Sequence, residues 1–101
     1  MPFDDETLVY KVMGKMFALT NLTGPFFVNL KCDPAKALEL RASYPAVTPG
    51  YHMNKDHWNT VHMDGTVEDN ELKAWTDHSY DQVVKGLPKK LLHQLITNPK
   101  L

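Results

Sequence analysis

Short turn signals divide the first third of this chain into three apolar runs. Gly14 and Lys15 separate the first two runs, and Asn21, Gly24 and Pro25 separate the second from the third. Parallel strands need a long crossover connection, so runs that are joined this closely pair as antiparallel strands. The sequence therefore predicts a three-stranded meander, with strands at residues 7–13, 15–20 and 26–31.

The middle of the chain predicts one helix and one further strand. Asp33 can cap a helix that has Pro34 in its first position, and Pro45 ends this helix. Residues 46–56 show no periodic pattern, so we expect them to be irregular. Residues 58–63 favour a fourth strand.

The last third of the chain predicts two helices. Apolar side chains at helical spacing, with Trp75 among them, indicate a helix over Asp69–Lys85 that Gly86 can end. A final helix is expected over residues 89–95. The predicted fold class is therefore α+β: an antiparallel sheet, made of the meander plus one further strand, packed against helices.

The composition is typical of one globular domain over residues 1–101, because 43% of the residues are hydrophobic and 23% are charged. No apolar run approaches the ~20 residues that a membrane helix needs. The acidic start lacks the features of a secretory signal, and the lone Cys32 fits a reducing compartment. We therefore expect a cytoplasmic protein without a membrane partner. The net charge of −1 excludes nucleic-acid binding by bulk charge alone, so any such binding needs clustered cations.

Five short motifs in fixed order resemble those of the MmcQ/YjbR family of small bacterial proteins, over about residues 3–92. The motifs are NLKCDP at residues 29–34, YPAVTPGYHMNK at 44–55, HWNTV at 57–61, SYD at 79–81 and GLPKK at 86–90. The resemblance implies a YjbR-like antiparallel sheet packed against helices and a DNA-binding function. It implies no catalytic residues and no cofactor. It also implies a helix before the segment that matches Pro2 and Phe3, but the given sequence starts at that point, and whether this helix is trimmed or naturally absent stays open. We expect an apolar strip of the sheet to be exposed in this chain.

The polar stretch from Thr48 to Thr60 is the best candidate for a binding site. Aromatic rings can stack on bases, and amide and lysine side chains can reach base edges or phosphates. The residues expected to bind nucleic acid or a partner are Lys31, Tyr51, His52, Asn54, Lys55, His57, Trp58, Asn59, Lys89 and Lys90. The alternative is a structural loop whose asparagine and histidine side chains satisfy backbone groups.

Two other groups of polar residues are weaker candidates for a functional site. His52, His57 and His62 have a regular spacing, but no cysteine or carboxylate cluster supports a metal site. His78 and the Tyr80–Asp81 pair lie too close together on a helix to converge on one point, so we expect no enzyme activity. The sequence favours a DNA-binding protein, and a protein-interaction or small-ligand-binding adaptor is the alternative. The DNA sequence preference and the oligomeric state stay open.

Overall fold

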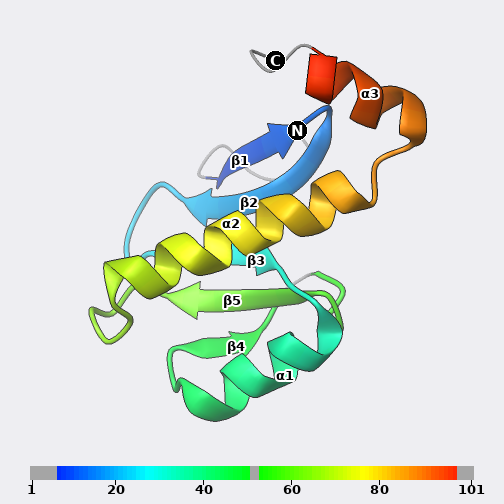
Figure 1. Cartoon of the computed structure of the whole chain (residues 1–101). Coiled ribbons are helices and arrows are strands. Elements are labelled where there is room, and N and C mark those ends of the chain that lie inside the picture. The colour runs from blue at the N-terminus through cyan, green and yellow to red at the C-terminus, as the bar shows by residue number, and fades with distance from the viewer. Residues whose placement is uncertain (1–6, 51–52, 98–101) are drawn as a thin grey trace.

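The computed structural model describes residues 7–50 and 53–97 and contains one five-stranded antiparallel sheet (Figure 1). Its strand order is β1-β2-β3-β5-β4. The strands are β1 (Thr7–Val12), β2 (Lys15–Asn21), β3 (Phe27–Lys31), β4 (Val47–Pro49) and β5 (Trp58–His62). The predicted meander is confirmed, because β1, β2 and β3 pair in sequence order. The predicted α+β class, with a sheet packed against helices, is confirmed as well.

Strand β4 corrects the expectation that residues 46–56 are irregular. It pairs with β5 through Val47↔Val61 and Pro49↔Asn59 and forms one edge of the sheet. Three residues are too few to show a periodic pattern, and a proline in a strand is tolerated at such an edge. Gly50 then allows the chain to approach β5 closely, because a Cβ at this position would lie 2.8 Å from the Cβ of Trp58.

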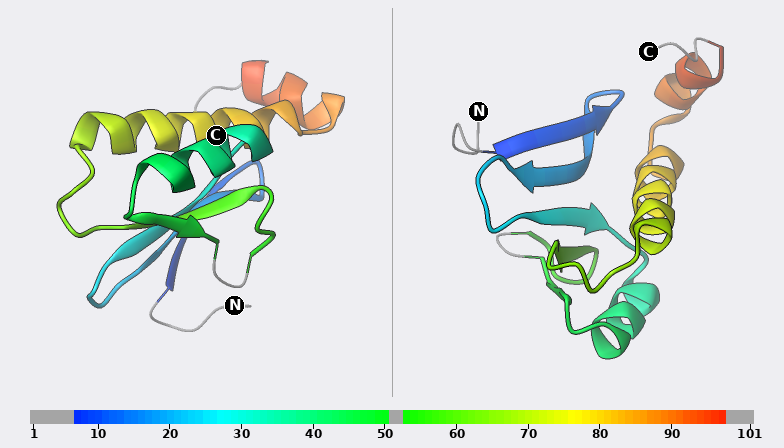
Figure 2. Two further views of the ribbon diagram at one scale, coloured as in Figure 1. Left: turned by 90° about the horizontal axis from the view of Figure 1, so that it is seen from below. Right: turned by 90° about the vertical axis from the view of Figure 1, so that its left-hand side faces the viewer.

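The described residues contain three helices, whose bounds lie close to the predicted ones. They are α1 (Pro34–Ser43), α2 (Asp69–Lys85) and α3 (Lys89–Thr97). The Asp33 side chain caps α1 by accepting a hydrogen bond from the N–H of Lys36 at 3.2 Å. Helices α1 and α2 lie on the same face of the sheet, and α3 extends beyond the end of α2 (Figure 2). Within the described part of the chain, no helix is long and apolar enough to cross a membrane.

The core lies between the sheet and α2. Trp75 of α2 is only 5% exposed and packs with Val28 and Leu30 of β3 and with Val61 of β5. The Tyr44 ring meets the Trp75 ring edge-on, with 4.9 Å between the ring centroids. The predicted helical stripe therefore does face the core.

The Ser79 hydroxyl fixes α2 on the sheet. Ser79 is fully buried; its Oγ accepts a hydrogen bond from the N–H of Lys31 at 2.8 Å and donates one to the carbonyl of Phe17. One side chain thus satisfies backbone groups of β2 and β3 together.

Replacing Trp75 with alanine should lower the free energy of unfolding by ~3–5 kcal/mol, because the cavity between α2 and the sheet cannot fully collapse. Urea denaturation followed by circular dichroism measures this loss. The control Lys73→Ala changes an exposed position of the same helix and should stay within ~0.5 kcal/mol of the parent. Equal effects of the two substitutions would contradict the assignment of Trp75 to the core.

Candidate functional site

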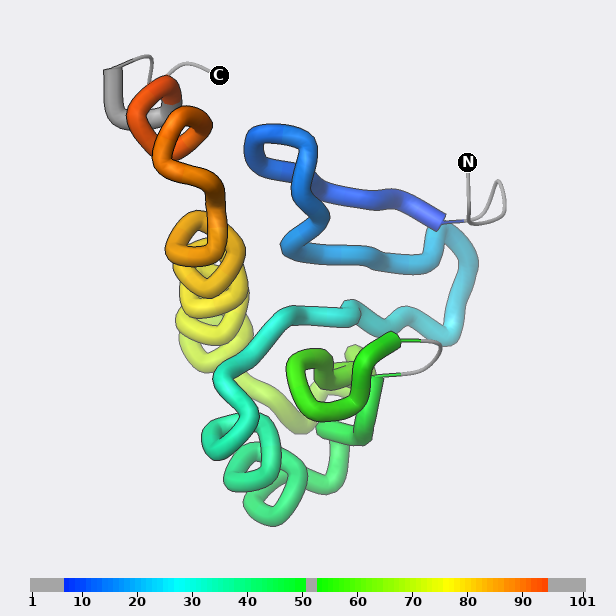
Figure 3. Tube along the Cα trace, turned by 90° about the vertical axis from the view of Figure 1, so that its right-hand side faces the viewer, coloured from blue at the N-terminus to red at the C-terminus, as the bar shows by residue number. Residues whose placement is uncertain are grey.

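The topology brings most of the lysines to one end of the sheet. Because neighbouring strands are antiparallel, the last residues of β1 and β3 lie at this end, together with the first residues of β2 and β5. Helix α1 starts directly after β3, and α2 ends there as well, as Figure 3 shows from that side. We call this region the lysine end, and its lysines are Lys11, Lys15, Lys31, Lys36, Lys55, Lys85, Lys89 and Lys90.

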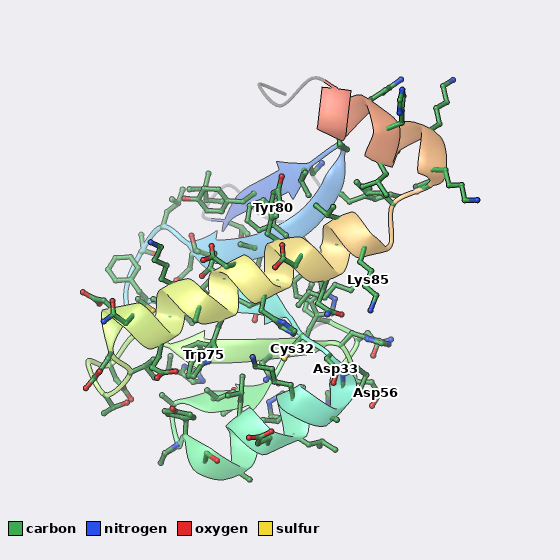
Figure 4. The ribbon with its side chains drawn as sticks, viewed as in Figure 1. Cys32, Asp33, Asp56, Trp75, Tyr80 and Lys85 are labelled. Carbon is green, nitrogen blue, oxygen red and sulfur yellow. The ribbon has the colours of Figure 1, made fainter. Side chains whose placement is uncertain are left out.

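The acidic residues are concentrated at the other end of α2. Asp64, Glu68, Asp69 and Glu71 lie in the turn after β5 and in the first turn of α2, and all four are exposed. Some acids also accompany the lysines: Figure 4 shows Asp33 and Asp56 at the same end as Lys85. The net charge of −1 therefore hides a separation of charge along the molecule.

Residues 53–57 form the loop that projects from the lysine end, and Arg41 of α1 holds this loop in place. The Arg41 Nη2 donates to the carbonyl of Lys55, and its Nε donates to the Oδ1 of Asn59 at 2.7 Å. The carbonyl of His57 accepts a hydrogen bond from the N–H of Cys32 at 2.7 Å. Because its backbone is tied to α1 and to the chain after β3, the loop presents Lys55 on a rigid support.

Several of the sequence-predicted binding residues come together at the lysine end. Asn54, Lys55, His57, Lys89 and Lys90 are exposed there, and Lys31 is half-buried at the end of β3. Tyr51 and His52 lie outside the described residues.

Trp58 and Asn59 require a correction, because neither side chain is available at the surface. Trp58 is 9% exposed and Asn59 is 2% exposed. The Asn59 amide accepts from Arg41 and donates to the carbonyl of Ala37 at 3.3 Å, which links β5 to α1. Asn59 therefore joins β5 to α1, and both side chains are buried where a ligand at the surface would not contact them.

The site also contains residues that were not predicted from the sequence. Lys11 and Lys15 flank the turn between β1 and β2, so the predicted meander already contained the signal that they share an end with Lys31. Arg41 carried no such signal, because its role depends on how α1 packs beside residues 53–57.

His78 and Cys32 lie near this end, but their surroundings are structural. The His78 Nε2 accepts a hydrogen bond from the N–H of Asp33 at 3.2 Å. Burial, and then Lys36, lower the pKa of His78, while Asp33 and Asp81 act in the opposite direction. Cys32 is 4% exposed, and burial raises the pKa of its thiol above the usual value. A buried thiol with a raised pKa lacks the features of an activated nucleophile.

The remaining candidates of the sequence analysis are separated in space. Tyr80 points toward β2, where its ring meets that of Phe17 edge-on at 5.3 Å between the centroids (Figure 4). His62 lies at the far end of β5 from His57 and contacts the Thr48 hydroxyl at 3.2 Å. Among the described residues, no three histidine, cysteine or acidic side chains are grouped so that they could hold a metal ion.

The model of the family described as YjbR matches residues 1–82 of this chain. The chain is 42% identical to the "Uncharacterized protein YbdF" of Escherichia coli O157:H7 over 90 residues, which covers 88% of this chain and 74% of YbdF. It is 44% identical over 71 residues to the "Uncharacterized protein YjbR" of Escherichia coli K12, which covers 67% of this chain and 60% of YjbR.

Solved structures share the fold. The crystal structure of Deinococcus radiodurans protein DR2400, described as domain DUF419, matches with a TM-score of 0.86 and 45% identity. The match covers 94% of this chain and 74% of DR2400. A protein from Pseudomonas syringae matches with a TM-score of 0.70 and 26% identity, covering 81% of this chain and 82% of that protein.

The lowered pKa of His78 predicts a loss of stability in mild acid. The unfolded chain binds this proton near pH ~6.5, whereas the folded protein takes it up only at lower pH. The contribution of His78 is therefore present above pH ~6.5 and is lost as the pH falls below that value. Denaturation at about pH 7.5 and about pH 5.5 should show this loss in the parent and a smaller loss in His78→Gln. Identical losses in both proteins would contradict it.

Proposed function

The chain belongs to the YjbR family, and we propose that it is a non-catalytic protein that binds duplex DNA through its lysine end. The observation that carries the proposal is the convergence of lysines from three strands' ends, a rigid loop and three helix termini on one end of the molecule. Local clustering of cations is the electrostatic footprint that DNA binding requires when the net charge is close to zero.

The proposed contacts are made mainly to phosphates. Lys55 extends from the loop that Arg41 holds, and the exposed Asn54 and His57 lie beside it within reach of a groove edge. Lys89 and Lys90, at the start of α3, contact the next phosphates of the DNA backbone. The acids at the opposite end of α2 turn the protein so that the lysine end meets the DNA first.

The surroundings of Cys32 and His78, two side-chain types that enzymes often use in catalysis, support binding rather than catalysis. Cys32 is buried, which raises the pKa of its thiol, and the Nε2 of His78 accepts a hydrogen bond from the N–H of Asp33. We further propose a cytoplasmic location, where the DNA is found and where a lone buried cysteine stays reduced.

Fluorescence anisotropy with a labelled duplex tests the proposal. At physiological salt the Kd should fall in the ~10⁻⁴–10⁻⁶ M range that non-specific binding shows, and the affinity should rise steeply at lower salt. The measured quantity is the slope of the logarithm of the binding constant against the logarithm of the salt concentration. Replacing Lys55 with alanine, or Lys89 together with Lys90, should lower the magnitude of this slope by about one for each lysine that contacts a phosphate.

The matched control is Lys73→Ala, which removes an exposed lysine near the acidic start of α2. It should leave the slope unchanged. Absence of binding at about 50 mM salt, or equal effects of Lys55→Ala and Lys73→Ala, would rule out the lysine end as a DNA-binding surface.

A further inference from the structure

The loop that projects from the lysine end has a backbone of defined shape. The N–H of His57 donates to the carbonyl of Asn54 at 3.2 Å, which closes a tight turn. Arg41 of α1 binds the carbonyl of Lys55 inside this turn. The side chains of Asn54, Lys55 and Asp56 are exposed on it. Because the backbone beneath them is fixed, these three neighbours meet a ligand as one unit.

The amide of Asn54 has a fixed orientation. Its Oδ1 accepts a hydrogen bond from the N–H of Asp56 at 2.9 Å, and only the oxygen of an amide can accept from an N–H group. The turn therefore leaves the Nδ2 group, which donates, to face a ligand. Asparagine recognises adenine by donating and accepting at the same time, through N7 and N6 of the base. Because its oxygen faces into the turn, Asn54 does not present that pair and offers a donor instead.

Asp56 places an exposed carboxylate at the lysine end (Figure 4). A surface that contacts only phosphates gains nothing from a carboxylate, because the two like charges repel each other. In the major groove, however, a carboxylate has a partner: it accepts a hydrogen bond from the N4 amine of cytosine. The presence of Asp56 beside Lys55 therefore favours a loop that contacts base edges over one that contacts the backbone alone.

The exposed groups of the turn match the major-groove edge of a G·C base pair. Along the chain they are a donor, a donor and an acceptor: the Nδ2 of Asn54, the Nζ of Lys55 and the carboxylate of Asp56. Across its major-groove edge, a G·C pair presents two acceptors, N7 and O6 of guanine, and then one donor, N4 of cytosine. An A·T pair presents an acceptor, a donor and an acceptor, followed by the thymine methyl group, so its order does not match.

We propose that this turn reads a G·C base pair in the major groove. Asn54 and Lys55 donate to N7 and O6 of guanine, and Asp56 accepts from N4 of cytosine. The inference rests on the proposed binding of duplex DNA and specifies the base preference of the same surface. Lys89 and Lys90 contact phosphates on either kind of sequence, so they supply affinity, whereas the turn supplies discrimination.

Labelled duplexes of equal length test this preference, because they carry the same number of phosphates and differ only in their base edges. They contain A·T pairs, G·C pairs, inosine–cytosine pairs, or G·C pairs with 7-deazaguanine. Inosine keeps N7 and O6 of guanine but lacks the N2 amine in the minor groove, whereas 7-deazaguanine lacks N7. In anisotropy titrations of the full chain at about 100 mM salt, the G·C and inosine duplexes should bind at least about fivefold more tightly than the A·T duplex. The 7-deazaguanine duplex should bind at least about threefold more weakly than the G·C duplex.

Two pairs of variants assign the preference to the turn. Asn54→Asp keeps an oxygen for the N–H of Asp56 but removes the Nδ2 donor, so the preference for G·C over A·T should fall below about twofold. Its control Asn70→Asp makes the same change of charge at an exposed position on α2 and should keep the preference. Asp56→Asn should strengthen the binding of both duplexes and lower the preference, whereas the control Glu39→Gln on α1 should leave the preference unchanged. Thermal melts establish that each variant is folded.

The same titrations distinguish base reading from the binding of phosphates. Equal binding of all the duplexes, with Lys55→Ala still weakening each of them, would overturn the reading of a G·C pair and leave the proposed DNA binding in place. An inosine duplex that binds like the A·T duplex would place the contact in the minor groove and would also overturn the inference. A preference that Asn54→Asp and Asn70→Asp change equally would contradict its assignment to the turn. Absence of binding to every duplex at about 50 mM salt would overturn the proposed function together with this inference.

Discussion

The hydrogen bonds of the buried Ser79 hydroxyl orient the helix on which the rest of the surface depends. Ser79 accepts from the N–H of Lys31 and donates to the carbonyl of Phe17, so α2 is tied to β2 and β3 at one point. Trp75, one turn earlier, fills the space between the same helix and the central strands. With two anchors one turn apart, both the position and the direction of α2 are set. Its basic end then lies beside the end of β3, and its acidic end lies beside the end of β5.

Two surfaces of opposite character follow from this one orientation. The end of α2 joins the strand ends and the loop of residues 53–57 in a cluster of lysines. The start of α2 places exposed carboxylates at the opposite end of the molecule. The net charge of −1 describes neither surface, because the positive charges of one and the negative charges of the other nearly cancel in the total. Membership of the YjbR family accounts for the scaffold, while function has to be argued from these surfaces.

The resemblance and the local signals anticipated most of the fold for identifiable reasons. The capping signal at Asp33 and the apolar stripe around Trp75 act within a few residues, so they are legible in the sequence. Strand β4 was missed because three residues with a proline form a strand only when β5 is there to pair with them. Burial of Trp58 and Asn59 was missed because polarity in a motif does not tell whether a side chain faces solvent or a neighbouring helix.

The sequence by itself determined the order and kind of the main elements, the meander, the helix boundaries and the absence of any strong net charge. These properties depend on spacing, turn residues and caps, which are local interactions. Only the tertiary structure decided that Arg41 holds the loop before β5, that lysines distant in sequence share one end, and that Tyr10, Phe26 and Met63 line one groove. Those relations depend on how antiparallel strands and a crossing helix are placed in space, and contacts between residues so far apart in the chain leave no periodic signal in a single sequence.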